Sequence, residues 1–416
     1  MLPYELVEQV VLACAKEDIA RISLAAKVFV DPAQTRLYER VRVAGPDECS
    51  QLLSLLQTSP HLAQKIKSFA YQGLCTDPPL QGIFLLLTKL KELELKERGV
   101  GVGRVSQATP DLESLLRLPT LEKLKLVRWR FQDEKGFTDL LANASPHCKH
   151  LTLDSPRIRN WGWPNQSLID TTKVERLLSP THLTIIDREN SDVILVPTRK
   201  FALLDLSCLR SLHLRTEQES HAGLSKVIQT LDASIQSLQL SPMNITDRCL
   251  PPVSFEGNST LKYLTIDHSH TWFGFRNDHR TRAHASFEEC TPMGYAGLVL
   301  ATFNPAVNIL EHLSLCFKRS PSDDLDSYEE QAFLSELARL IAVVAKTFPR
   351  LHRLEYSLIG LPSRSVKRLR KIVRRLWMDC RKGESCIVVS VANEPVYEYT
   401  EEADSDKREY SIFLWE

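Results

Sequence analysis

Histidine, aspartate and cysteine residues gather between residues 267 and 290 of the chain. Imidazole nitrogens, carboxylate oxygens and thiolates bind metal ions in proteins, and the candidate ligands are Asp267, His268, His270, His279, His284 and Cys290. Their spacing follows neither a HExxH motif nor paired CxxC motifs, so a metal site is one interpretation among several. Trp272, Phe275 and Arg276 belong to residue types enriched at protein interaction hot spots. A partner-binding loop, a surface insertion without a ligand and contact with nucleic acid are the alternatives.

No catalytic motif accompanies these side chains. The chain contains no G-x-S-x-G elbow, no P-loop, no dinucleotide-binding fingerprint and no cysteine in a recognisable protease setting. We therefore expect a protein that is not an enzyme and that takes no cofactor. An enzyme built on an α/β domain is the alternative, and a loss of turnover on mutating a pocket residue would support it.

Composition narrows the classes of partner. The 52 lysines and arginines balance 52 aspartates and glutamates, so no global charge attracts nucleic acid or a membrane surface. Ten cysteines are scattered without CxxC pairs, and no signal peptide precedes Leu2. No apolar run is long enough to span a bilayer. We expect reduced thiols, a cytoplasmic or nuclear location, and neither a membrane nor a nucleic-acid partner.

One pattern, apolar-x-x-apolar-x-apolar, recurs through most of the chain. The alternation at its end is typical of a strand with one buried face. Successive copies are separated by 24 residues from Ile66 to Leu90 and by 26 from Leu209 to Ile235, whereas Leu261 and Leu310 are 49 apart. The copies occupy residues 66–71, 90–95, 121–126, 148–153, 209–214, 235–240, 261–266, 310–315 and 351–356, with part of the pattern at 182–185.

Helical patterns lie between these copies, for example at residues 136–144, 225–233 and 328–346. One strand and one helix per repeat predict an α/β solenoid with parallel strands on the concave side and helices on the convex side. The pattern resembles leucine-rich repeats in degenerate form, because the asparagine or cysteine expected after each strand is mostly missing and Asn244 is only a near match. A globular α/β domain is the alternative fold.

In such a solenoid, alternate residues of each strand face outward on the concave side. A solenoid commonly binds its partners there, although each position taken singly can also be a solvated side chain without a ligand. The candidate target-binding residues on this face and in the insertion near residues 268–300 are Lys123, Lys125, His150, His213, Arg215, Tyr263, Trp272, Phe275 and Arg276.

The first 43 residues predict a small helical unit. Pro3 stands in the first turn of a helix with a wide apolar arc, and Ile19 to Phe29 continue as a second helical pattern. Asp31 and Pro32 predict the N-cap and first residue of a third helix, and residues 41–43 leave in an extended pattern. A unit of about 40 residues rarely buries enough surface to be stable alone, so its apolar surface must pack on the chain or on a partner.

This stretch resembles an F-box, the module through which substrate receptors bind the Skp adaptor of Skp-cullin-F-box ubiquitin ligases. The opening Leu-Pro of the family falls on Leu2 and Pro3, and its aromatic residue on Phe29, where tryptophan is usual. Its Glu-Leu pair falls on Glu5 and Leu6, and its acidic-apolar pair on Asp18 and Ile19. The candidate adaptor-binding residues are Leu2, Pro3, Glu5, Leu6, Val10, Ile19, Ile22 and Phe29.

The resemblance implies a non-catalytic receptor whose partners are a Skp-type adaptor, a cullin reached through it, and a target protein that the repeats hold for ubiquitination. An interaction scaffold unconnected to ubiquitination is the alternative. The expected domains are an F-box-like domain (1–44), a linking helix (45–65), the solenoid (66–361), and a C-terminal part (362–416) with a basic amphipathic helix and closing strands at 385–391 and 411–415.

Overall fold

The protein is an α/β structure with one large, open, parallel sheet. The computed structural model describes residues 3–97, 109–132, 134–158, 178–187, 204–216, 234–242, 255, 258–273, 292–319, 327–359, 371–372, 374–375 and 388–392. Within these ranges the sheet has 12 strands in the order β1-β2-β3-β4-β6-β8-β9-β10-β11-β12-β13-β14, and the main-chain pairing between neighbours is parallel throughout. The predicted α/β class with parallel strands is confirmed.

The strands follow one another along the chain and lie side by side in the same order. Their bounds are β1 Arg40–Ala44, β2 Ser68–Gly73, β3 Glu92–Glu97, β4 Lys123–Val127, β6 His150–Asp154, β8 His182–Asp187, β9 Ser211–Thr216, β10 Ser237–Leu240, β11 Tyr263–Phe273, β12 His312–Arg319, β13 Arg353–Ile359 and β14 Val388–Ala392. Two short strands, β5 (Arg130–Phe131) and β7 (Arg157–Ile158), pair separately. Each predicted copy of the pattern therefore coincides with a strand of the large sheet.

Two rows of apolar side chains run across the sheet and form its core. Because side chains alternate between the faces of a strand, the fourth and sixth positions of the pattern share the face that the helices cover. These two rows are Val41, Phe69, Leu93, Leu124, Leu151, Leu183, Leu212, Leu238, Leu264, Leu313 and Leu354, and Val43, Tyr71, Leu95, Leu126, Leu153, Ile185, Leu214, Leu240, Ile266, Leu315 and Tyr356. From Val43 to Tyr356 most of these side chains belong to one continuous core.

A repeated main-chain contact connects successive strands from β1 to β13. The carbonyl of the residue before one strand accepts two N–H groups from the start of the following strand. The Lys67 carbonyl accepts from Lys91 and Glu92 at 2.8 and 3.0 Å, and the Lys262 carbonyl accepts from Glu311 and His312 at 2.9 and 3.0 Å. The contact is therefore the same whether the repeat is short or long.

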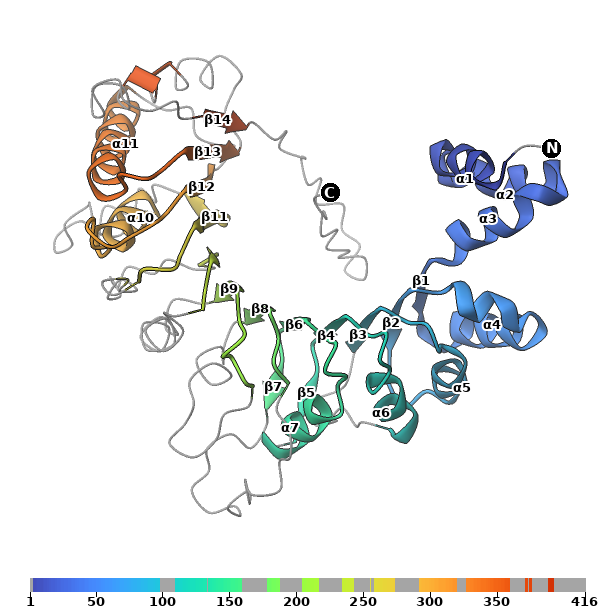
Figure 1. Cartoon of the computed structure of the whole chain (residues 1–416). Coiled ribbons are helices and arrows are strands. Elements are labelled where there is room, and N and C mark those ends of the chain that lie inside the picture. Colours follow the sequence, from blue (N-terminus) through green and yellow to red (C-terminus); the bar gives the residue numbers. More distant parts are fainter. Residues whose placement is uncertain are drawn as a thin grey trace.

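The sheet is curved into an arc, and Figure 1 shows the helices on its outer side and the strands along its inner side. The apolar side of each helix covers the leucine rows. The helices of this layer are α4 Gly45–Thr58, α5 Pro78–Leu86, α6 Pro110–Leu116, α7 Glu134–Ala142, α10 Pro292–Ala301 and α11 Ser327–Thr347, with the 3₁₀ helix η1 at Pro60–Lys65. The helices predicted at 136–144 and 328–346 correspond to α7 and α11, and the one at 225–233 lies outside the described residues.

Three helices, α1 (Tyr4–Ala13), α2 (Lys16–Ala25) and α3 (Lys27–Tyr38), extend beyond β1 at one end of the arc (Figure 1). We call them the N-terminal helical unit. Val11, Ile19 and Ala33 form its buried centre, which is separate from the core of the sheet. Residue 44 ends β1, which pairs with β2, so the sheet begins before the solenoid boundary expected at residue 66.

One local prediction needs correction. Asp31 does not cap a third helix, because α3 begins at Lys27 and contains Pro32. The segment expected as an insertion near residues 268–300 overlaps the end of β11, which reaches Phe273, and most of α10. At the C-terminus, β14 matches the strand expected at 385–391, whereas the strand expected at 411–415 lies outside the described residues. Of the predicted basic helix only residues 371, 372, 374 and 375 are described, and they are helical.

Candidate functional site

The N-terminal helical unit exposes several large apolar side chains. Among the residues that the structure describes, eleven large apolar side chains are exposed, and six of them belong to α1, α2 and α3. Leu24 is 86% exposed and Leu6 is 51% exposed. We call this set the apolar face, and its members are Tyr4, Leu6, Val10, Leu12, Leu24 and Val28. Water contacts these side chains in the isolated chain, so their burial by a partner would be favourable.

The structure divides the predicted adaptor-binding residues into two groups. Pro3, Glu5, Leu6 and Val10 are exposed and accessible to a partner. The other group lies in or against the centre of the unit, since Ile19 is fully buried and Ile22 and Phe29 are partly buried there. Leu2 lies outside the described residues.

Sequence reasoning missed four members of the apolar face: Tyr4, Leu12, Leu24 and Val28. In α1 the buried residues are Val7 and Val11, so the exposed apolar residues lie on either side of this stripe. The width of the apolar arc was a signal for such residues. A helix that buries only one stripe and is apolar over a wider arc leaves the remainder exposed.

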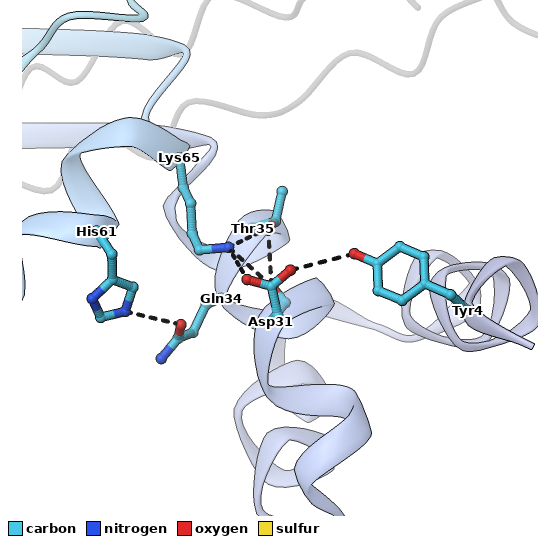
Figure 2. A network of polar contacts seen from close by, with 6 residues as sticks. All are labelled: Tyr4, Asp31, Gln34, Thr35, His61 and Lys65. Atoms are coloured by element: carbon cyan, nitrogen blue, oxygen red, sulfur yellow. Dashed lines mark hydrogen bonds and ion pairs between the residues drawn. The ribbon is translucent and has the colours of Figure 1, made fainter. Parts of the chain in front are cut away.

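Polar contacts join this unit to η1 (Figure 2). Lys65, which ends η1, donates to Asp31 Oδ1 at 2.5 Å and to Thr35 Oγ1 at 2.8 Å, both on α3. The Tyr4 hydroxyl approaches Asp31 Oδ2 at 3.3 Å, and His61 contacts Gln34 at the same distance. The side chain of Lys65 is only 13% exposed. These contacts connect α1 and α3 to the layer of helices beneath the sheet.

The contact with Lys65 changes the pKa of Asp31. The hydrogen bond from Lys65 lowers the pKa of Asp31 below its ordinary value, although burial acts in the opposite direction. Burial and the Asp31 carboxylate raise the pKa of Tyr4. Asp31 is therefore an anion that binds the Lys65 ammonium of η1 and the Tyr4 hydroxyl of α1.

The concave side of the sheet presents two outward rows of side chains. The first row is Arg40, Ser68, Glu92, Lys123, His150, His182, Ser211, Ser237, Tyr263, His312 and Arg353. The second is Arg42, Ala70, Glu94, Lys125, Thr152, Thr184, His213, Gln239, Thr265, Ser314 and Glu355. Five predicted target-binding residues, Lys123, Lys125, His150, His213 and Tyr263, thus lie in two continuous rows.

Charged residues in the first part of these rows form ion pairs between strands. Lys123 Nζ lies 2.6 Å from Glu92 Oε1, and Lys125 Nζ lies 3.1 Å from Glu94 Oε1. Burial raises the pKa of Glu92, but the hydrogen bond and charge of Lys123 outweigh it and leave that pKa lowered. A partner that uses either lysine must therefore compete with a carboxylate that already binds it.

Rings form the most prominent contacts further along the first row. His150 and His182 are stacked with their ring centres 4.2 Å apart, and Tyr263 and His312 meet edge to face at 6.1 Å. His213 in the second row contacts Ser241 at 3.3 Å. Tyr263 is 46% exposed and is the one strand residue among the exposed large apolar side chains described. Arg215 follows at the next outward position of β9.

Burial lowers the pKa of both stacked histidines. For His150 the neighbouring His182 and Lys123 add to the effect, and for His182 the neighbouring Arg210 does so. Both imidazoles are therefore held neutral at pH 7.

The remaining predicted residues belong to the segment after β11 begins. Trp272 lies in β11, opposite Lys318 of β12, and Phe275 and Arg276 lie outside the described residues. His268 is buried and stacks on Phe317 with ring centres 5.5 Å apart, so it is part of the core. In the described ranges, no group of three or more acidic, histidine or cysteine side chains is placed to hold a metal ion.

Comparisons with known proteins return no match: neither a protein-family model nor a curated protein matches the chain significantly. Within the described part of the chain, no helix has the length and apolar character needed to cross a membrane. The cysteines described as free thiols are Cys14, Cys49, Cys75, Cys148, Cys208 and Cys316.

Proposed function

We propose that the protein is a substrate receptor of a Skp-cullin-F-box ubiquitin ligase. In this proposal the N-terminal helical unit is an F-box that binds the Skp adaptor, and the sheet belongs to a leucine-rich-repeat solenoid whose concave side binds a target protein. The receptor itself makes and breaks no bonds. It raises the effective concentration of target lysines near the ubiquitin-conjugating enzyme.

The observation that carries the proposal is the apolar face at the end of the arc. Each apolar side chain removed from water contributes about 1.5 to 3 kcal/mol, so six exposed side chains on three short helices favour association with a partner. The resemblance of residues 2–43 to an F-box supports the Skp adaptor as that partner. Leu6, which the resemblance aligns with the family, is also an exposed member of the face.

The arrangement of the two surfaces also supports a receptor. The N-terminal helical unit, which carries the apolar face, lies at one end of the arc, while the strands that carry the outward rows lie along its inner side (Figure 1). Two partners could therefore bind at the same time. Lys65 and Asp31 connect the two parts, which is what a receptor needs if it is to hold a target at a defined place relative to the ligase.

A pull-down with purified Skp adaptor tests the proposal. The variant Leu6→Arg/Val10→Arg places two charges on the apolar face without altering the buried Val7 and Val11. We expect adaptor binding to weaken by more than about 100-fold, because two apolar contacts are replaced by charges. Leu85→Arg on α5 is the matched control, since Leu85 is exposed outside the unit and should leave binding unchanged.

Absence of binding by well-folded wild-type protein would contradict the F-box assignment, as would an equal loss in the Leu85→Arg control. Circular dichroism establishes that each variant is folded. A second measurement separates a receptor from a scaffold: inhibition of the cullin ligase should raise the level of a protein that co-purifies with the sheet. A co-purifying protein whose level stays constant favours the scaffold instead.

A further inference from the structure

Charge is absent from the middle of the concave side, where histidines occur instead. Eight consecutive outward positions on four neighbouring strands contain no aspartate, glutamate, lysine or arginine. None of the eight side chains is buried, so a partner can reach them. We call this set the histidine band, and its members are His150 and Thr152 of β6, His182 and Thr184 of β8, Ser211 and His213 of β9, and Ser237 and Gln239 of β10.

The stacked pair in this band has unused hydrogen-bonding capacity. The Thr181 hydroxyl donates to the Lys149 carbonyl at 3.3 Å and lies 2.9 Å from His182 Nδ1. When that hydroxyl gives its single hydrogen to the carbonyl, it can only accept from His182 Nδ1, and in this arrangement Nε2 is left to receive a second proton. Within the described ranges, neither His182 Nε2 nor the ring of His150 forms a hydrogen bond or an ion pair, so a protonated pair would direct N–H donors toward the concave side.

Charged residues surround the band, and the neighbouring glutamates already form ion pairs. Lys123 and Lys125 bind Glu92 and Glu94, and Glu122 binds Lys91 at 3.0 Å. Asp154, at the next outward position of β6 after Thr152, is a carboxylate that accepts a hydrogen bond from the Ser155 hydroxyl. The other charged neighbours are cations, namely Lys149 before β6, Arg210 before β9, and Arg215 on β9. Lys149 and Arg210 are exposed and have no ion-pair partner among the described residues.

From this geometry we infer that the histidine band binds an acidic, aspartate- and glutamate-rich segment of the target protein, and that binding is coupled to protonation of His150 and His182. Carboxylates fit because the band has donors, gains cations on protonation, and lacks an outward carboxylate of its own. Protonation of two rings 4.2 Å apart is opposed by their mutual repulsion, and a bound anion relieves it. This inference rests on the proposed function, since it names the class of target that the concave side would hold.

Fluorescence anisotropy with a labelled oligoglutamate peptide tests the inference on the full-length chain, with an oligoglutamine peptide as the neutral reference. We expect oligoglutamate to bind more tightly at about pH 6 than at about pH 7.5, by up to tenfold per pH unit for each proton taken up. Added salt should weaken this binding. Calorimetry in buffers of different ionisation enthalpy should report the proton uptake directly.

The variant His150→Gln/His182→Gln retains polar side chains but cannot gain charge, and it should lose the pH dependence. His147→Gln is the matched control, because His147 is an exposed histidine outside the outward rows. Affinity that is independent of pH, or equal in the double variant and the wild type, would overturn the inference. Tighter binding of a single-stranded oligonucleotide than of oligoglutamate would also overturn it.

The acidic C-terminal segment of the chain is a competing source of carboxylates. A full-length variant with Gln or Asn at Glu394, Glu398, Glu401, Glu402, Asp404 and Asp406 removes those charges. If the wild type binds oligoglutamate at about pH 6, the band is accessible to the acidic segment of a partner protein. Binding that occurs only in the neutralised variant would overturn the inference and assign the band to the chain's own tail. The adaptor pull-down does not involve the band, so failure here and failure of the F-box assignment are distinguishable.

Discussion

The N-terminal helical unit and the sheet use similar apolar residues with opposite results. In the sheet, each strand places its two leucine-type side chains in rows that neighbouring repeats and helices bury, and one core extends through the arc. In the helical unit, Val11, Ile19 and Ala33 form a small separate buried centre, while six large apolar side chains remain exposed. Repetition makes the sheet self-sufficient, whereas the small unit depends on contacts outside itself.

A matched pair of substitutions, one in each region, gives the largest expected effect. Leu124→Ala in the sheet and Ile19→Ala in the helical unit each remove a fully buried side chain and should cost about 2–5 kcal/mol at their own sites. Hydrogen exchange should show faster exchange through the sheet for Leu124→Ala, but only within α1 to α3 for Ile19→Ala. Equal loss of protection in both regions by both variants would mean that the unit and the sheet unfold together.

A smaller effect is expected from the contact that joins the regions. Lys65→Met removes the cation held by Asp31 and should destabilise the docking of α3 on η1 by about 1 kcal/mol, seen as faster exchange in α3. Lys67→Met removes the more exposed Lys67–Glu39 pair and should have a weaker effect.

The same contact should also weaken in acid. Because the folded pKa of Asp31 is lowered, its contribution is present above the ordinary aspartate pKa and is lost as pH falls through the lowered value. Acid-induced loosening of α3 should therefore occur below about pH 4 in the wild type and be absent from Lys65→Met. Identical acid behaviour of the two proteins would show that another group controls the junction.

The smallest effect concerns the sheet alone and arises from the stacked histidines. The folded pKa values of His150 and His182 lie below the ordinary value, so the unfolded chain binds more protons as pH falls. The free energy of unfolding should therefore decrease as pH falls from about 7 through about 6.5 and below. In denaturant titrations across this range, the free energy of unfolding should fall less steeply with pH for His150→Gln/His182→Gln than for the wild type. An equal slope in both proteins would exclude the histidine pair as the source of the pH dependence.

The strands were predictable because their signal is local. In each copy of the pattern, apolar and polar residues alternate, and the apolar ones are buried. Neighbouring repeats give Leu93, Leu124 and Leu151 the same environment. Other features depend on distant parts of the chain. The sequence around Asp31 and Pro32 resembles a helix start, but the partner of Asp31 is Lys65, which no local pattern identifies.

The candidate binding surfaces also depend on contacts between distant parts of the chain. The wide apolar arc of α1 was visible in the sequence, but the position of α3 decides that Val7 and Val11 are buried and that Leu6 is exposed. The outward positions of each strand were predicted, whereas the pairing of Lys123 with Glu92 and the stacking of His150 on His182 require the register between strands. Single-strand patterns thus identify which residues face outward, and only the register shows which of them act together.

The two-donor main-chain contact at the start of each strand has a consequence for how such a molecule can change over generations. Because the contact between Lys262 and the next repeat has the same form as that between Lys67 and its successor, the intervening chain can grow or shrink on the outer side without disturbing the inner surface. Insertions on the outer side therefore leave the surface that binds a partner unchanged. A lineage can add segments to the outside of the arc while the spacing of its ligand-facing side chains stays constant, and engineered insertions at the same loops should be tolerated for the same reason.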